Sequence, residues 1–180
     1  MKKIPTIFMR DPANMKGVLP AHNPACEWVF DGEGVATRKY DGTCCKVEGG
    51  KLFKRREVKP GQTTPAEFVE EQLDDNTGKR VGWMPVDCND KQDAYHCEAF
   101  TGQDDGTYEL LGPKVQGNPE EMGKHVLVSH AAADIYPDCP RDMEGLKAWF
   151  ADRDIEGVVF HHPDGRMAKI KKRDFGMKRN

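Results

Sequence analysis

The chain has 180 residues, of which 37% are hydrophobic and 32% charged, and its formal net charge is −3. This size and composition predict one soluble globular domain with a single core and argue against a disordered chain. The small negative charge argues against a protein that coats nucleic acid indiscriminately. No run of about 20 apolar residues is present, and residues 1–5 lack the apolar stretch of a signal peptide. We therefore expect a cytoplasmic protein without a membrane segment.

The six cysteines form no Cys-x-x-Cys motif. Cys44 and Cys45 are adjacent, which is a poor arrangement for an ordinary disulfide. We therefore predict reduced thiols that serve mostly as packing groups. A zinc site built from Cys88, His96 and Cys97 is a weaker alternative, because their spacing matches no familiar zinc-binding pattern.

The first half of the chain predicts mostly strands. The first 30 residues contain four spaced prolines and are expected to form an extended segment wrapped on the core. Residues 34–39 predict a strand that ends at Lys39. Residues 43–48 and 51–55 predict a hairpin, because the Gly49-Gly50 pair between them suits a two-residue turn.

A short helix is predicted to begin at Thr64 and to run to about Leu73. Thr64 suits the N-cap, Pro65 suits the first helical position, and Glu67 lies three residues after the cap. Apolar-rich runs bounded by Gly, Asp or Pro predict further strands at residues 83–86, 95–100, 107–111 and 126–129.

The last third of the chain predicts a helix followed by a hairpin. The helix covers residues 141–151, where apolar side chains recur at i, i+3 and i+4. The hairpin pairs residues 156–161 with residues 166–172. Because side chains alternate along a strand, Lys169 and Lys171 share one face, while Ala168 and Ile170 can pack on a core. Sheets and helices together predict an α+β fold.

Lys39-Tyr40-Asp41-Gly42 has the form Lys-x-Asp-Gly, which occurs by chance in roughly one chain of this length in twenty. Four further motifs follow it in order: Lys-Arg-Arg-Glu at 54–57, Tyr-Glu-Leu-Leu-Gly at 108–112, Ile-Glu-Gly-Val-Val-Phe at 155–160 and Ala-Lys-Ile-Lys at 168–171. The ordered set resembles the covalent nucleotidyltransferase superfamily of ATP-dependent nucleic-acid ligases and capping enzymes. Residues 39–45 and 111–119 look most like small 5′-to-3′ RNA ligases.

The resemblance implies one nucleotidyltransferase (ligase adenylation) domain over residues 1–180, with antiparallel sheets flanked by helices and a nucleotide cleft between them. The given sequence ends ten residues after Ile170, so we expect no appended OB-fold domain, which favours an RNA ligase over a DNA ligase or a capping enzyme.

The resemblance assigns the chemistry to four side chains. Lys39 is implied to attack the α-phosphate of ATP and to carry AMP. Its amine has to be neutral, so its pKa has to be lowered by burial and by nearby cations. Lys169 and Lys171 are implied to supply that charge and to hold the triphosphate. Glu156 is implied to associate with Mg²⁺ or Mn²⁺.

Other residues are implied to bind the nucleotide or the substrate. Glu109 is implied near the ribose or as a second metal contact, and Asp41 and Gly42 belong to the nucleotide-binding motif. Arg55 or Arg56 is expected to contact the ribose or the substrate's 5′-phosphate, because a guanidinium suits phosphate. Arg56 is slightly preferred of the two, and Lys54 is a further candidate for a phosphate contact.

Family members stack an aromatic ring on adenine in the region after Glu109. The candidates that we consider are His125, His130 and Tyr136, and the stacking residue stays unassigned among them.

The implied function is that of an ATP-dependent RNA ligase with a role in RNA repair. AMP passes from Lys39 to an RNA 5′-phosphate, and a 3′-OH then displaces AMP to form a phosphodiester. The basic clusters at residues 51–59 and 166–179 are candidates for RNA phosphate contacts, and a monomer is expected. The alternatives are a DNA ligase, a GTP-using guanylyltransferase, and a catalytically silent RNA-binding module of the same fold.

Overall fold

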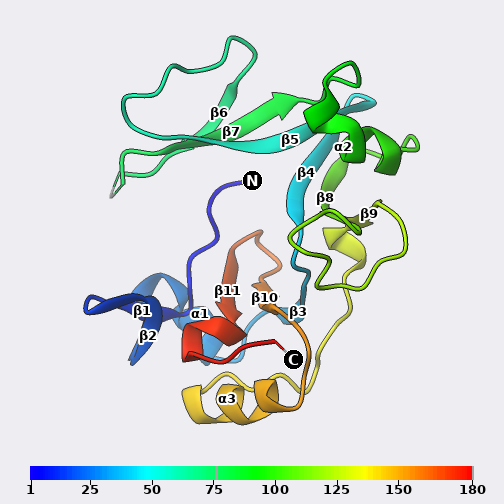
Figure 1. Ribbon diagram of the computed structural model, residues 1–180. Coiled ribbons are helices and arrows are strands. Elements are labelled where there is room, and N and C mark those ends of the chain that lie inside the picture. The colour runs from blue at the N-terminus through cyan, green and yellow to red at the C-terminus, as the bar shows by residue number, and fades with distance from the viewer. Residues whose placement is uncertain (76, 180) are drawn as a thin grey trace. The chain divides into compact units, whose positions relative to one another are not determined.

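The structure is a computed structural model that describes residues 1–75 and 77–179. It has the predicted α+β fold, with antiparallel sheets and short helices (Figure 1). The chain divides into two compact units, which we name the six-stranded unit (residues 1–3 and 41–132) and the three-stranded unit (residues 4–40 and 133–179). The single domain over residues 1–180 stays a prediction, and residues 76 and 180 of that range lie outside the described part.

The six-stranded unit contains one antiparallel sheet with the strand order β6-β7-β5-β4-β8-β9. The predicted hairpin forms here, and its turn at Gly49 and Gly50 has φ angles of 57° and 71°, which glycine adopts readily. The strands predicted at residues 107–111 and 126–129 are confirmed. The elements are β4 (Thr43–Glu48), β5 (Lys51–Val58), β6 (Val69–Leu73), β7 (Arg80–Pro85), η2 (Lys91–Asp93), α2 (Ala94–Ala99), β8 (Gly106–Leu111), β9 (Val126–Ser129) and η3 (His130–Ala132).

The three-stranded unit contains the antiparallel sheet β11-β10-β3 and a separate β1-β2 hairpin. Residues 5–7 lie along the outer edge of β11, where Lys169 N donates to Pro5 O at 2.9 Å. The predicted strand at Lys39, the helix near residues 141–151 and the final hairpin are confirmed. The elements are β1 (Phe8–Asp11), β2 (Asn14–His22), η1 (Pro24–Cys26), α1 (Glu27–Phe30), β3 (Val35–Lys39), α3 (Met143–Ala151), β10 (Gly157–His161), β11 (Met167–Lys171) and η4 (Lys172–Phe175).

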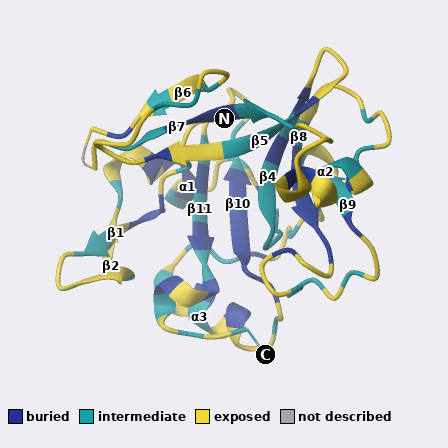
Figure 2. Ribbon diagram, turned by 45° about the horizontal axis from the view of Figure 1, so that its top comes forward, coloured by how far each residue is buried: buried dark blue, intermediate teal, exposed yellow. Residues whose placement is uncertain are grey.

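One face of the three-stranded sheet packs into an apolar core. Figure 2 shows β10 buried along most of its length. Strand β1 and helices α1 and α3 pack against this face. They add Phe8, Trp28, Val29, Leu146, Trp149 and Phe150 to the core. The sheet itself contributes Ala36, Val158, Phe160, Ala168 and Ile170, each at most 4% exposed. Because side chains alternate along a strand, the residues between these core positions point to the opposite face of the sheet.

A second core lies on one face of the six-stranded sheet, between its central strands and helix α2. Its buried members are Cys45, Val47, Leu52, Ala99, Tyr108, Leu110 and Val115. The face of β4, β5 and β8 that points away from this core carries the alternate side chains of those strands.

The helix predicted between Thr64 and Leu73 is wrong. Its second half is strand β6, in which Val69 pairs with Trp83 of β7. The indole Nε1 of Trp83 also donates to Glu71 Oε2 at 2.9 Å. Pairing with a neighbouring strand therefore overrides the helix-start pattern, which is a local signal.

The strand predicted at residues 95–100 is also wrong, because this segment is helix α2. The Asp90 side chain accepts from Gln92 N at 2.9 Å and caps the short η2 turn that leads into α2. The reduced state predicted for all cysteines is wrong as well, because Cys88 and Cys97 form a disulfide. Helix α2 brings their Cα atoms to 5.8 Å, a separation that a disulfide spans.

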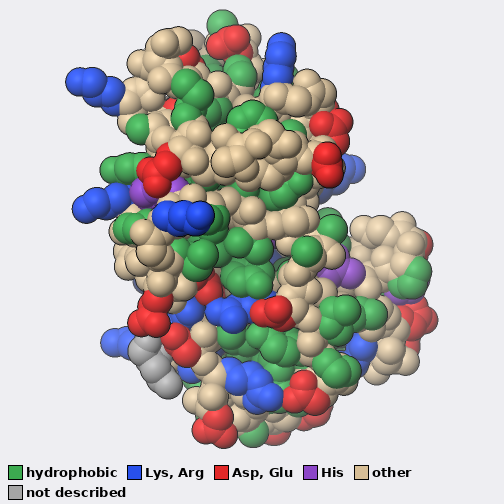
Figure 3. Space-filling model, turned by 90° about the vertical axis from the view of Figure 1, so that its right-hand side faces the viewer, with side chains coloured by type: hydrophobic (Ala, Val, Ile, Leu, Met, Phe, Trp, Pro, Cys, Tyr) green, Lys and Arg blue, Asp and Glu red, His purple; other side chains and the backbone are tan. Residues whose placement is uncertain are grey.

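No helix in the described ranges is long and apolar enough to cross a membrane. On the face shown in Figure 3, Lys and Arg side chains lie among Asp and Glu side chains. The two signs of charge are therefore mixed on this face.

Candidate active site

The face of the three-stranded sheet opposite its core carries the predicted catalytic lysines. Strand β10 lies between β3 and β11 and pairs with both, so side chains from the three strands form rows across the sheet. The first row is Lys39, Gly157 and Lys171, and the second row is Thr37, Val159 and Lys169. The register thus brings together three lysines that are far apart in the sequence.

Glu156, which precedes β10, joins the two lysines of the first row. Its Oε2 lies 2.5 Å from Lys39 Nζ, and its Oε1 pairs with Lys171 Nζ. Lys39 Nζ also donates to the carbonyl oxygen of Tyr40 at 3.3 Å. The side chains of Lys39, Lys171 and Glu156 are only 19%, 12% and 9% exposed. Charges that are so little exposed require partners of this kind.

Burial and charge shift the pKa values of this cluster. Burial raises the pKa of Glu156, but the charges of Lys39 and Lys171 outweigh it and hold that pKa below its ordinary value of 4.5. Burial, and then the charges of Lys171 and Lys39, lower the pKa of Lys169 to about 8. Burial also lowers the pKa of Lys171, with a further contribution from Lys39. Three basic groups around one carboxylate suit a polyanion such as a polyphosphate.

Residues 134–136 hold the edge of β3 that does not pair with β10. Arg38 N donates to Asp134 O at 2.8 Å, and Tyr136 N donates to Ala36 O at 2.9 Å. The Tyr40 hydroxyl donates to Asp134 Oδ2 at 3.4 Å, and the Arg38 guanidinium lies 5.0 Å from the centre of the Tyr40 ring. The strand that presents Lys39 is therefore bonded on both edges. No sequence motif signalled this support, since Asp134 is distant in the chain.

In the six-stranded unit, the nucleophile motif and the glutamate motif meet through Gly42 and Glu109. Gly42 N donates to Glu109 Oε1 at 3.2 Å. A Cβ added at Gly42 would lie 2.2 Å from Leu110 O, so only glycine fits this approach of the two strands. Asp41 N donates to Glu120 Oε1 at 3.0 Å. Two of the predicted nucleotide-binding motifs are thus brought into direct contact within this unit.

The two arginines of the second motif lie on opposite faces of the six-stranded sheet. The register of β4 with β5 and β8 places Arg55 on the face that carries Glu109, and Arg56 on the other face. Arg55 Nη1 donates to the main-chain oxygen of Met1, while the Arg56 side chain is exposed. The preference for Arg56 stays untested, but the shared face with Glu109 now favours Arg55.

Lys54 lies on the core face of β5 and pairs with Asp93. Asp93 is 2% exposed. Burial raises its pKa, but the Lys54 hydrogen bond and other partners lower that pKa below its ordinary value. This pairing with Asp93 gives Lys54 a partner within the protein, and the phosphate contact predicted for Lys54 stays a prediction.

The three candidates for adenine stacking lie in different environments. The His125 ring stacks on Tyr95 with 4.4 Å between ring centres. The Tyr136 ring packs edge-on against Trp149 with 5.2 Å between ring centres. His130 Nε2 lies 3.0 Å from Glu109 Oε2. Among the described residues, His130 is thus the candidate that contacts a predicted nucleotide-binding residue, although its sequence position gave no sign of this.

The two carboxylates predicted as metal contacts lie in different units, Glu156 in the three-stranded unit and Glu109 in the six-stranded unit. Across residues 1–75 and 77–179, no group of three or more His, Cys, Asp or Glu side chains is arranged to hold a metal ion. Mg²⁺ needs only one or two carboxylates when phosphate oxygens and water complete its shell. Glu156 beside the lysines therefore fits an ion that arrives with a nucleotide.

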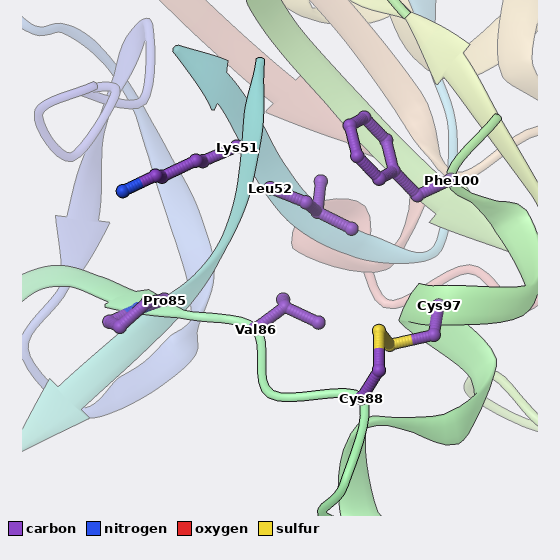
Figure 4. A pocket seen from close by; sticks show the side chains of 7 residues that line it. All are labelled: Lys51, Leu52, Pro85, Val86, Cys88, Cys97 and Phe100. Carbon is purple, nitrogen blue, oxygen red and sulfur yellow. A yellow bond between two sulfur atoms is a disulfide. The ribbon is translucent and has the colours of Figure 1, made fainter. Parts of the chain in front are cut away.

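A cavity of about 220 Å³ lies elsewhere in the six-stranded unit, beside the disulfide (Figure 4). Figure 4 shows the Lys51 side chain extending away from the apolar groups of the lining. None of the described residues that line it belongs to the predicted site. The lining is Lys51, Leu52, Pro85, Val86, Cys88, Cys97 and Phe100.

Comparison with known proteins points to RNA ligases. Residues 100–180 match the protein family described as RNA ligase 1. The chain is 26% identical to RNA ligase 1 of Danio rerio in an alignment 219 positions long, gaps included, that covers 79% of this chain and 67% of the relative. It is 24% identical to RNA ligase 1 of Rattus norvegicus in an alignment 263 positions long, gaps included, that covers 98% of this chain and 81% of the relative. These matches confirm the predicted resemblance to RNA ligases of the nucleotidyltransferase type.

The family match includes much of the predicted site. Glu109, Glu156, Lys169 and Lys171 lie within residues 100–180, whereas Lys39 precedes them. The structure pairs Lys39 with Glu156, so the nucleophile motif is joined by contact to a residue inside the matched region.

Proposed function

We propose that this protein is an ATP-dependent RNA ligase in which Lys39 carries AMP. RNA as the acceptor is supported by the similarity to proteins named RNA ligase 1. Covalent AMP transfer is supported by one observation above all. That observation is the cluster of Lys39, Glu156 and Lys171 on one sheet face, with Lys169 in the neighbouring row.

In the first step, the neutral amine of Lys39 attacks the α-phosphate of ATP. A nitrogen–phosphorus bond forms, the bond from the α-phosphorus to the bridging oxygen breaks, and pyrophosphate leaves with the electron pair while the nitrogen loses a proton. Lys169 and Lys171 stabilise the negative charge of the phosphates in the transition state. Their low exposure strengthens this effect, because water screens the charges less.

In the second and third steps, AMP passes from Lys39 to an RNA 5′-phosphate, and a 3′-OH then attacks that phosphate and displaces AMP. In the six-stranded unit, we propose that Glu109 binds the ribose of the nucleotide and that Arg55 binds a phosphate. Asp41 and Gly42 position the motif around Lys39. A guanidinium suits phosphate because its donors match two oxygens at once.

A divalent cation, Mg²⁺ or Mn²⁺, is proposed to bind with the nucleotide at Glu156. When bound, it would neutralise charge on the phosphates. Glu156 has a second role that needs no metal, because it compensates the charges of Lys39 and Lys171.

The decisive test is transfer of label from α-labelled ATP to the denatured protein. We expect label on the wild type and none on Lys39→Ala. Lys147→Ala is a matched control, because Lys147 is a surface lysine that pairs with Glu144 on helix α3. This control should label like the wild type. Label on the Lys39→Ala protein would refute the assignment of the nucleophile.

The acceptor and the nucleotide are tested separately. Unlabelled ATP should compete with the label and unlabelled GTP should not, and a nick in RNA should be sealed faster than the same nick in DNA. Faster sealing of DNA would replace the proposal with a DNA ligase, and competition by GTP alone would replace it with a guanylyltransferase. RNA binding without any transfer of label would indicate a silent RNA-binding module.

A further inference from the structure

The sheet face that carries the candidate active site also presents side chains that belong to none of the five sequence motifs. Thr37 and Lys169 flank Val159 in the second row. His161 lies two residues beyond Val159 on β10, so its side chain is on the same face. Thr37 and His161 lie outside all five sequence motifs.

The ring of His161 points along the sheet toward the row that contains Thr37 and Lys169. In the strand register His161 pairs with Val35, yet its Nε2 lies 3.1 Å from Thr37 Oγ1, in the row closer to Lys39. The Thr37 hydroxyl donates its proton to Val159 O at 3.2 Å. Its oxygen therefore accepts from Nε2–H of His161. This contact draws the ring toward the second row, which lies roughly 7 Å along the strand from the first row.

We propose that His161, held by Thr37, binds the pyrophosphate that leaves ATP when Lys39 is adenylylated. This inference rests on the proposed function. In that step the Lys39 nitrogen bonds to the α-phosphorus and loses a proton, and the bridging oxygen departs with pyrophosphate and the electron pair. His161 contacts the leaving group, and Thr37 is a positioning residue that acts through His161.

The direction of departure and the distribution of charge support this position. In an in-line displacement the leaving group lies on the side of phosphorus opposite the attacking atom, and therefore away from the Lys39 amine. Pyrophosphate is a polyanion that needs cationic partners. Beyond the first row, the strands β3, β10 and β11 offer the amine of Lys169 and the imidazole of His161 on this face. An imidazole can donate a hydrogen bond to a phosphate oxygen.

The proposal is tested with inorganic pyrophosphate and the variant His161→Gln. Titration calorimetry should show that the variant binds pyrophosphate roughly ten- to a hundredfold more weakly than the wild type, which corresponds to the loss of one charge-assisted hydrogen bond. Single-turnover labelling of Lys39 by ATP should slow by a similar factor. Sealing of nicked RNA that already carries AMP on its 5′-phosphate should stay within about twofold of the wild type, because it releases no pyrophosphate.

His162→Gln is the matched control. His162 follows the end of β10, pairs with Glu33 and Asp164 and packs edge-on against Trp28, so its variant should bind pyrophosphate like the wild type. Thr37→Val should weaken pyrophosphate binding, and Thr37→Ser should restore it, because serine keeps the hydroxyl that holds the ring.

Two results would overturn the proposal. One is unchanged pyrophosphate binding by both His161→Gln and Thr37→Val. The other is an equal loss in the sealing of pre-adenylylated RNA, which would mean that His161 acts on the fold or on a later step. A wild type that takes up no label refutes the proposed function instead, and the pyrophosphate titration then still decides the role of His161.

Discussion

Glu156→Gln is the most informative single change in the three-stranded unit. It keeps the size of the side chain and removes the charge that pairs with Lys39 and Lys171. Because Glu156 is 8% exposed, the change leaves two ammonium groups without their counter-charge in a site that holds little water. A third, Lys169, lies in the adjacent row.

The expected cost follows from the burial of this cluster. Breaking a buried ion pair by removing one partner costs about 3–5 kcal/mol. The side chains of Lys39 and Lys171 are 19% and 12% exposed and keep some contact with water, so we expect the lower end, about 3 kcal/mol. Loss of a proton from a lysine limits the cost further, since each pKa unit is worth about 1.4 kcal/mol.

The pH dependence has a definite sign. The pKa of Glu156 is lowered below 4.5 in the folded protein, so the carboxylate stabilises the fold above its unfolded pKa. That stabilisation is lost as the pH falls through the folded value. The difference in unfolding free energy between wild type and Glu156→Gln should therefore be full at pH 7 and should shrink on acidification below about pH 4.5.

Urea unfolding followed by tryptophan fluorescence measures this difference, because Trp28 and Trp149 lie in the core of the same unit. Glu144→Gln is the control, because Glu144 makes an exposed helix pair with Lys147. Such a pair contributes at most about 1 kcal/mol. A cost below about 1 kcal/mol for Glu156→Gln at pH 7, or a difference that grows on acidification, would refute the reasoning.

Two further predictions concern the six-stranded unit. Gly42→Ala should destabilise the protein by about 1–3 kcal/mol or more, because the added Cβ would lie 2.2 Å from Leu110 O. The control is Gly123→Ala, whose added Cβ would meet no atom within 4 Å. Thermal unfolding should show that this control is nearly neutral. Reduction of the disulfide between Cys88 and Cys97 should cost about 2–3 kcal/mol for its short loop. Cys88→Ser should already have lost this contribution, so an equal response of both proteins to reductant in thermal unfolding would contradict the prediction.

The secondary structure of a segment could be predicted from the sequence where a local pattern, such as a turn sequence or an apolar period, determines it. The Gly49-Gly50 turn requires positive φ angles and defines its hairpin, and the apolar period around Leu146 defines helix α3. The segment at Thr64 has a good helix-start pattern, but its chain pairs with β7 through Val69 and Trp83. Tertiary pairing prevails there because intrinsic helix preferences differ by only tenths of a kcal/mol per residue.

The candidate site could be predicted by residue type but not by partner. Strand alternation placed Lys169 and Lys171 on one face and Ile170 in the core, as the structure shows. The contact between Lys39 and Glu156 spans 117 positions, and it depends on the register of β10 against β3. A one-residue slip would turn each side chain to the other face. Register is therefore the information that the motifs alone lack.

The same contact sets a condition on the proposed chemistry. Attack on phosphorus needs the lone pair of the Lys39 nitrogen, while the 2.5 Å contact with Glu156 favours the ammonium form. The ion pair is therefore a resting arrangement that has to open before the amine can react. Phosphates that bind at Lys169 and Lys171 would compete with Glu156 for Lys171 and so weaken the resting cluster. Nucleotide binding and activation of Lys39 are thus expected to be coupled through Glu156.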